Sequence, residues 1–254
     1  MGKKRDRRAT MSKRILILVE GPTEERFVKD VLQPAYSGRG IYFFPTILVT
    51  KRVKNGPNFK GGVTNFAKFK NDVNRLLNNP GGALVTTMLD YYALPKDFPG
   101  MSTRPVSTAV ERVRHVEDAI AFHFGRPFNF LPFFALHEFE AWLFSSPTEL
   151  PKVMTERTKE SAFTAIIREF SSPEEINEKP GSAPSKRIKA LFPAYRKPLH
   201  GPLAAQRIGL EHIRKSCRHF DDWLIKMEHY ATDGAPALRA PPPAWDKGPE
   251  AIGG

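Results

Sequence analysis

Acidic residues follow three separate apolar runs of this 254-residue chain. They are Glu20 after residues 15–19, Asp90 after residues 83–89, and Glu138 after residues 128–136. A carboxylate at the end of a buried strand is costly unless a cation or a hydrogen-bond donor pairs with it. The three positions therefore suggest a shared charged site.

Two more glutamates, Glu24 and Glu25, open the helix that follows Gly21-Pro22. One interpretation is purely structural, because the helix dipole favours acidic residues in the first turn by about 0.3–1 kcal/mol. That interpretation explains Glu20 less well, since Glu20 precedes the turn. Glu24 lies on the same helical stripe as the apolar residues that face the sheet, whereas Glu25 points outward. Converging carboxylates repel one another unless a cation lies between them, and oxygen ligands favour Mg²⁺ or Mn²⁺.

Apolar runs and helical patterns alternate along the first 150 residues. Strands are expected at residues 15–19, 41–50, 83–89 and 128–136, and helices at 23–35, 63–78 and 107–124. This alternation predicts an α/β fold with a mostly parallel central sheet flanked by helices. Ligands of such sheets gather at the carboxyl ends of the strands, which is where the acidic residues fall.

The alternation stops after Pro147, so the rest of the chain has a different organisation. We divide the sequence into a flexible basic arm (1–12), an α/β core (13–150), a helical C-terminal part (151–231) and a disordered tail rich in Pro and Gly (232–254).

The net charge of +12 indicates a polyanionic partner. The first ten residues carry +4 of it, which leaves +8 for the rest of the chain. Nucleic acid is the partner we favour, because phosphates release counterions when basic side chains bind them. The alternative is that the charge serves no specific partner.

Several classes of protein are disfavoured by composition. No apolar run approaches the roughly 20 residues of a membrane-spanning helix, and the N-terminus has no apolar segment typical of a signal peptide. A single cysteine, Cys217, excludes an internal disulfide framework and a cysteine-based zinc site. We expect a cytoplasmic protein with no membrane association.

Basic and aromatic residues offer contacts to nucleic acid. The segment 50–62 contains Lys51, Arg52, Lys54 and Lys60, which could hold a phosphate backbone or could form a plain solvated loop. Tyr91 and Tyr92 could stack on bases or pack under the turn.

Two segments, "VEGPTEERFV" and "MLDYY", resemble the TOPRIM fold of topoisomerases, primases and OLD-type nucleases. The spacing of Glu20 and Glu24 is more similar to the OLD-type nucleases. "HEFEAWLF" and "SAPSKRI" resemble a bacterial family of TOPRIM-like proteins of unknown function that are often encoded beside ATPases. The resemblance covers residues 13 to 230 and implies a TOPRIM-like Rossmannoid core.

The resemblance implies metal-dependent phosphodiester chemistry. Glu20 matches the TOPRIM glutamate, and Asp90 matches the first aspartate of an Asp-x-Asp motif whose second position is Tyr92 here. Glu138 or Glu140 would supply the missing ligand. Lys186 would stabilise charge near the scissile phosphate or would be a solvated lysine at a helix start, and we add the adjacent Arg187 to the nucleic-acid contacts.

Two hypotheses follow. The first is a nuclease-like enzyme that uses Mg²⁺ or Mn²⁺ on DNA or RNA, as an effector of phage defence working with an ATPase. Its catalytic residues would be Glu20, Glu24, Asp90 and Lys186. The alternative is a catalytically degenerate subunit that binds a partner ATPase or nucleic acid, and Tyr92 in place of an aspartate favours it.

Overall fold

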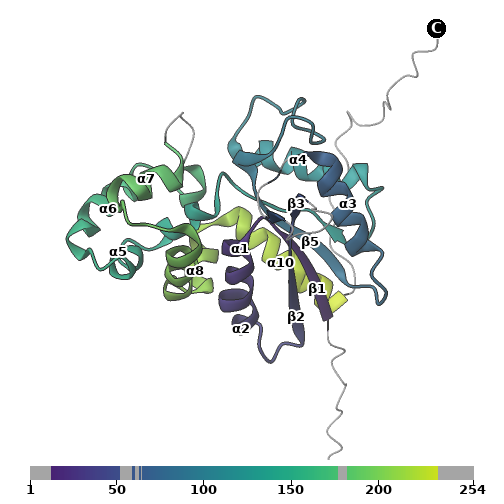
Figure 1. Ribbon diagram of the computed structural model, residues 1–254, viewed down its shortest axis with the longest axis horizontal. Coiled ribbons are helices and arrows are strands. Elements are labelled where there is room, and N and C mark those ends of the chain that lie inside the picture. Colours follow the sequence, from purple (N-terminus) through teal and green to yellow (C-terminus); the bar gives the residue numbers. More distant parts are fainter. Residues whose placement is uncertain (1–12, 52–58, 61–62, 64, 177–181, 234–254) are drawn as a thin grey trace, which may run out of the picture.

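Five strands form a parallel sheet at the centre of the computed structural model (Figure 1). The structure describes residues 13–51, 59–60, 63, 65–176 and 182–233. The strand order is β2 (Ile41–Ile47), β1 (Lys13–Val19), β5 (Leu84–Asp90) and β6 (Phe130–Leu131), with β7 (Phe134–Ala135) also paired to β5. Every pairing in this sheet is parallel, as the alternation predicts.

The two faces of the sheet pack against separate groups of helices. Along β1, Ile15, Ile17 and Val19 point into one apolar core, and Leu16 and Leu18 point into the other. Successive side chains of a strand alternate between faces, so an unbroken apolar run is needed when both faces are covered.

The helices of the first half lie on both faces (Figure 1). On the face of Ile15 and Ile17 lies one helical segment, made of α1 (Pro22–Phe27), the π-helical η1 (Val28–Leu32) and α2 (Gln33–Ala35). On the opposite face lie α3 (Phe66–Leu77) and α4 (Ala109–His123). Among the described residues, no helix has the length and apolar character needed to cross a membrane.

Short elements connect these helices and strands. A separate antiparallel pair is formed by β3 (Val49–Lys51) and β4 (Phe59–Lys60). Two 3-10 segments follow strands of the main sheet, η2 (Tyr91–Ala93) after β5 and η3 (Phe139–Ser145) after β7.

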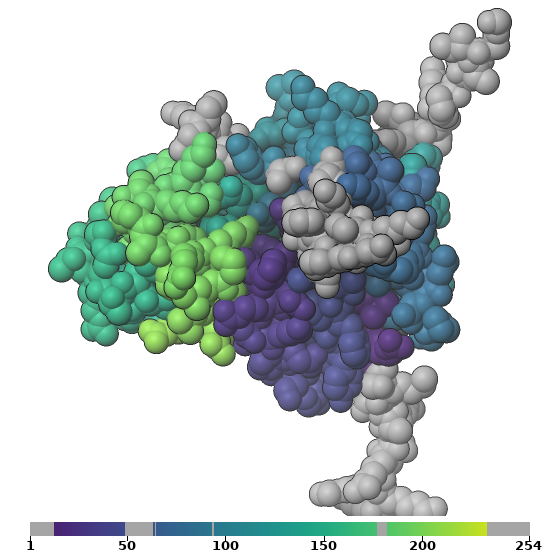
Figure 2. All heavy atoms as spheres, viewed as in Figure 1, coloured from purple at the N-terminus to yellow at the C-terminus, as the bar shows by residue number. Residues whose placement is uncertain are grey.

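The second half of the chain is helical. Its elements are α5 (Glu149–Val153), η4 (Arg157–Lys159), α6 (Glu160–Arg168), η5 (Pro173–Glu175), α7 (Pro184–Leu191), α8 (Lys197–Ile208), α9 (Leu210–Ser216) and α10 (Arg218–Asp233). In Figure 2 the light green surface of this half lies directly against the purple surface of the N-terminal helices, in agreement with the packing of α8 on α1.

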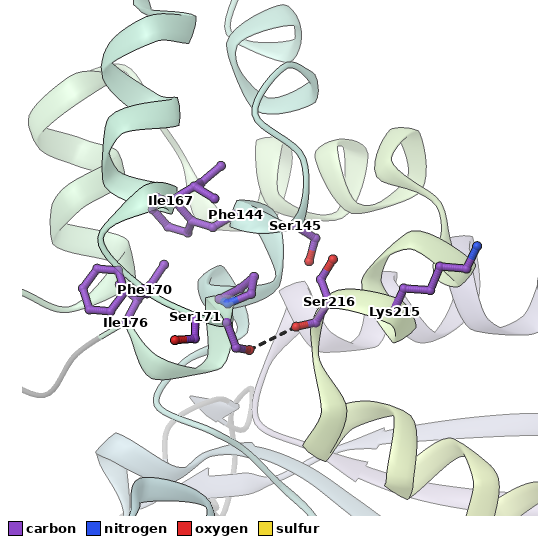
Figure 3. Close-up of a pocket in the computed structure, with 10 residues that line it drawn as sticks. Phe144, Ser145, Ile167, Phe170, Ser171, Ile176, Lys215 and Ser216 are labelled. Atoms are coloured by element: carbon purple, nitrogen blue, oxygen red, sulfur yellow. Dashed lines mark hydrogen bonds between the residues drawn. The ribbon is translucent and has the colours of Figure 1, made fainter.

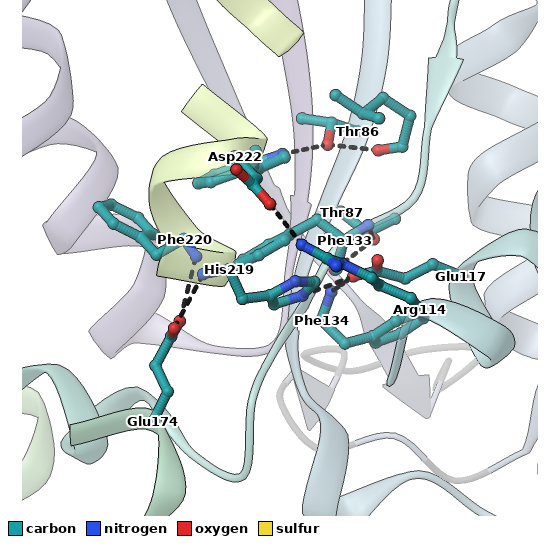
Figure 4. Close-up of polar contacts among 12 residues, drawn as sticks. Thr86, Thr87, Arg114, Glu117, Phe133, Phe134, Glu174, His219, Phe220 and Asp222 are labelled. Atoms are coloured by element: carbon teal, nitrogen blue, oxygen red, sulfur yellow. Dashed lines mark hydrogen bonds and ion pairs between the residues drawn. The ribbon is translucent and has the colours of Figure 1, made fainter. Parts of the chain in front are cut away.

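Polar contacts connect α10 to the sheet and to its neighbouring helices (Figure 4). The indole Nε1 of Trp223 donates to Oγ1 of Thr86 at 2.8 Å, and Nε2 of His219 lies 3.0 Å from Oε1 of Glu117. The carboxylate of Glu174 accepts the backbone N–H groups of His219 and Phe220. The C-terminal helices therefore share their core with the sheet.

The structure differs from the sequence prediction in two strands. The strand expected at residues 41–50 is divided between β2, which ends at Ile47, and β3, which begins at Val49 and belongs to the other sheet. The run 128–136 holds two short strands, β6 and β7, on either side of Pro132 and Phe133. Proline has no backbone N–H to donate to a neighbouring strand, so Pro132 interrupts the strand pairing at this point. The predicted arm (1–12) and the tail from residue 234 onward lie outside the described residues.

Candidate active site

Four of the five predicted acidic residues meet at the carboxyl edge of the sheet. Glu20 follows β1, Asp90 is the last residue of β5, Glu24 lies in α1, and Glu140 lies in η3 after β7. Parallel strands end at one edge, so their terminal residues are brought together although they are far apart in sequence. The sequence predicted that Glu20, Glu24, Asp90 and at least one of Glu138 and Glu140 would lie together here. The structure places Glu140 with the others, whereas Glu138 accepts a hydrogen bond from α7.

A lysine that the sequence analysis did not single out lies among these carboxylates. Nζ of Lys197 is 2.8 Å from Oδ2 of Asp90, 3.1 Å from Oε2 of Glu140 and 3.4 Å from Oε1 of Glu24. We call Glu20, Glu24, Asp90, Glu140 and Lys197 the acidic cluster. Three carboxylates from three separate elements thus surround one ammonium group.

Backbone hydrogen bonds fix the acidic side chains. The N–H of Asp90 donates to Oε2 of Glu20 at 3.0 Å, and the N–H of Gly21 donates to Oε2 of Glu24 at 3.0 Å. Oδ1 of Asp90 accepts the N–H of Phe139 at 2.9 Å. Each of these three carboxylates therefore has one oxygen committed to the backbone, which orients the group.

Burial is the main influence on the pKa values of the glutamates in the acidic cluster. Burial, together with the neighbouring charge of Asp90, raises the pKa of Glu20 to about 7. Burial raises the pKa of Glu140 to about 7 and also raises that of Glu24, although Lys197 opposes both shifts. Burial disfavours the charged form of Lys197, but the surrounding carboxylates outweigh it and hold its pKa well above the usual range. The cluster therefore favours the gain of positive charge.

Other predicted site residues lie outside this cluster. Oε2 of Glu138 accepts the N–H of Ser185 at 2.9 Å, at the start of α7. Lys186 is exposed on α7. The guanidinium of Arg187 pairs with Glu169 at 3.0 Å. Of the two lysines, it is Lys197 that contacts the carboxylates.

The predicted nucleic-acid contacts are only partly described. Lys51 lies in β3 and Lys60 lies in β4, whereas Arg52 and Lys54 fall outside the described residues. Of the two tyrosines after Asp90, Tyr91 is buried and Tyr92 is 60% exposed.

Gly201 allows α8 to pack closely enough for Lys197 to contact the acidic cluster. A Cβ atom at Gly201 would lie 3.0 Å from Cε1 of Phe139 and 3.1 Å from the hydroxyl of Tyr195, both closer than ordinary contacts. The tyrosine hydroxyl is buried and has no hydrogen-bond partner among the described residues. Burial and the charge of Glu140 raise the pKa of Tyr195, which keeps the hydroxyl protonated.

Sequence signals for these residues are weak. Lys197 stands before a proline at the first turn of a helix, and Gly201 is an isolated glycine in a helical pattern. A lysine at a helix start is ordinarily a solvated residue, so its type and position do not predict a contact with Asp90.

The donor chemistry of the acidic cluster fits a hard divalent cation. All of its acidic donors are carboxylate oxygens, and the buried Oε1 of Glu24 and Oε2 of Glu140 accept no hydrogen bond apart from their ion pairs with Lys197. In the part of the chain that the structure describes, no group of three or more His, Cys, Asp or Glu side chains has the arrangement needed to hold a metal ion. A cation would therefore share the carboxylates with Lys197.

A pocket of about 250 Å³ lies elsewhere, among the C-terminal helices (Figure 3). Its walls include Phe144 and Phe170, with the hydroxyl of Ser172 donating to the carbonyl of Ser216 at 3.0 Å. No residue of the acidic cluster lines it. The chemistry of the cluster is thus separate from this pocket.

Fold and site together define an α/β protein with a parallel sheet and a buried acidic cluster at its carboxyl edge. Residues 19–228 match the family described as a domain of unknown function, DUF4276, and the chain belongs to that family. None of the curated proteins matches the chain.

Among solved structures, the C-terminal region of the Xanthomonas campestris pv. campestris OLD protein is similar, at 19% sequence identity and a TM-score of 0.33. The match covers 86% of this chain and 98% of that one. At this level of likeness, function has to be argued from the residues of the site.

Proposed function

We propose that this protein is a nuclease-like phosphodiester hydrolase that acts on nucleic acid with Mg²⁺ or Mn²⁺. The observation that carries the proposal is the convergence of Glu24, Asp90 and Glu140 around the ammonium group of Lys197. Glu20 joins them by accepting the backbone N–H of Asp90. The TOPRIM-like sequence of these segments supports the same reading. The positive charge of the chain suits a polyanionic substrate.

The carboxylates and the lysine of the acidic cluster would have different roles in the reaction. Glu20, Glu24, Asp90 and Glu140 would hold the cation, which when bound neutralises the scissile phosphate and activates a water. Lys197 would place its ammonium group against the charge that builds up on the phosphate oxygens. The buried hydroxyl of Tyr195 remains a hydrogen-bond donor beside the cluster.

The source of ATP hydrolysis, if the reaction is coupled to it, would be a companion protein. The sequence contains no Gly-x-x-x-x-Gly-Lys-Ser/Thr phosphate-binding loop. A role as an effector of phage defence beside such an ATPase is part of the proposal.

The test compares Asp90→Asn and Glu20→Gln with Glu211→Gln, an exposed glutamate on α9. Millimolar Mg²⁺ or Mn²⁺ should raise the melting temperature of the wild type and of the Glu211 variant, because ligands stabilise the state that binds them. The two site variants should show a much smaller shift and should lose at least about 100-fold in cleavage of DNA or RNA.

A second function is favoured by two observations. Tyr92 stands where the resemblance predicts a second aspartate, and the ammonium of Lys197 already pairs with three carboxylates. These features suit a degenerate subunit that binds a partner ATPase or nucleic acid. The absence of both a metal-dependent melting shift and cleavage in the wild type would favour this function, whereas a metal shift without cleavage would indicate that a companion is required.

A further inference from the structure

Two neighbouring tyrosines in the turn after Asp90 have opposite environments. Tyr91 is 6% exposed and packs in the apolar core with Leu94 and Phe98. Tyr92 is 60% exposed. Packing under the turn therefore accounts for Tyr91 and leaves the exposed ring of Tyr92 unexplained.

The backbone of Tyr92 is held between the two loops that build the acidic cluster. Its N–H donates to the carbonyl of His137 at 3.1 Å, which joins the turn after β5 to the turn after β7. Two residues earlier, Asp90 is bonded to Lys197 and to the N–H of Phe139. Tyr92 thus lies on a turn that is hydrogen-bonded to the neighbouring loop, two residues after Asp90 of the acidic cluster.

The loop that follows Tyr92 in sequence contains two basic residues, Lys96 and Arg104, and one acidic residue, Asp97. Lys96 and Arg104 are both exposed in the loop between η2 and α4. Arg104 is held in place, because its Nε donates to the carbonyl of Met101 at 2.8 Å and its Nη1 donates to the hydroxyl of Tyr91 at 3.3 Å. Proteins that bind single strands combine such cations, which hold phosphates, with aromatic rings on which bases stack.

We infer that Tyr92 is a stacking platform for the base of a nucleotide next to the scissile bond, and that the substrate is single-stranded nucleic acid or a splayed end. The inference rests on the proposed function for the reaction, but the binding of the base needs no metal. A base inside an intact duplex is stacked on its neighbours and cannot lie on a side chain. A tyrosine suits this role because its large ring has few rotatable bonds to be fixed on binding.

The binding test uses a single-stranded oligonucleotide that carries 2-aminopurine, in EDTA so that no cleavage occurs. The change Tyr92→Leu should weaken binding about 5- to 150-fold, the range that corresponds to one stacked base. Tyr92→Phe should bind as the wild type does, because it keeps the ring. The matched control is Tyr42→Leu, at a tyrosine that is 48% exposed on β2 near the amino edge of the sheet, and it should change nothing.

Three arms separate this inference from the proposed function. The wild type should bind the single strand more tightly than a duplex of the same sequence, and equal affinity would overturn the inference. A wild type that cleaves with metal while Tyr92→Leu binds and cleaves normally would overturn the inference alone. Binding that depends on Tyr92, without any cleavage, would support the stacking role and contradict the hydrolase function. No binding at all would contradict both.

Discussion

Nζ of Lys197 and Oδ2 of Asp90 lie 2.8 Å apart although 107 residues separate them in the chain. Asp90 ends the central strand β5, and Lys197 is the first residue of α8. The contact joins the sheet to the C-terminal helices at the point where the carboxylates converge. The acidic cluster is therefore complete only when both parts of the chain are folded together.

The change Lys197→Met tests this contact. Removing one partner of a buried ion pair costs about 3–5 kcal/mol, and we expect about 3 kcal/mol because the side chain of Lys197 is 30% exposed. Urea unfolding with and without Mg²⁺ measures the loss, and the metal should recover part of it. Lys186→Met, at an exposed lysine of α7, should stay within about 0.5 kcal/mol of the wild type. Equal stability of the two variants would contradict the role of Lys197.

The change Gly201→Ala tests the approach of α8. The added Cβ would lie 3.0 Å from Cε1 of Phe139, so the helix has to shift or the ring has to move. We expect a loss of about 1–3 kcal/mol in the free energy of unfolding and weaker metal-dependent stabilisation, since Lys197 lies one turn away on the same helix. Arg207→Ala, at an exposed position of α8, is the control. If Gly201→Ala is as stable as the wild type, the close packing of Gly201 against Phe139 is not required for stability.

Trp223 tests the attachment of α10 to the sheet. Its ring stacks on Phe133 with centroids 4.3 Å apart, and its Nε1 donates to Thr86. Trp223→Ala should cost about 3–5 kcal/mol because it leaves a cavity in the shared core. Trp223→Phe should cost less, about 1 kcal/mol from the lost hydrogen bond plus a smaller loss of packing. Denaturant unfolding measures both, and a small cost for the alanine variant would contradict the shared core.

His219 predicts a dependence of stability on pH. Burial favours the neutral ring, but the carboxylates of Glu117 and Glu174 outweigh burial and the repulsion of Arg114, so the pKa of His219 is raised in the folded state. The protonated ring then stabilises the fold below its unfolded pKa of about 6.5, and this contribution is lost as the pH rises through the higher folded value.

The measurement is the free energy of unfolding between about pH 6 and pH 9, for the wild type and for His219→Gln. Glutamine can still donate to Glu117 but does not titrate in this range. The wild type should lose stability relative to the variant as the pH rises, and parallel curves would show that His219 does not gain its charge on folding.

The sequence by itself determined the α/β class and the place of the acidic residues. Unbroken apolar runs require cover on both faces, as the burial of residues 15–19 in β1 illustrates, and parallel strands end at one edge. These local rules bring Glu20, Glu24 and Asp90 together before any tertiary contact is known. They also predicted that Glu138 or Glu140 would join them.

Only the tertiary structure decided which cation and which glutamate complete the cluster. Glu140 reaches Lys197, whereas Glu138 accepts the N–H of Ser185, and nothing in the local pattern separates the two. Lys197 lies in a helix more than a hundred residues after Asp90. Gly201 allows that helix to pack closely against Phe139. Local sequence fixes the period and burial of each element, but a contact between distant elements depends on how whole helices pack. The choice of Lys197 over Lys186 is a result of that packing.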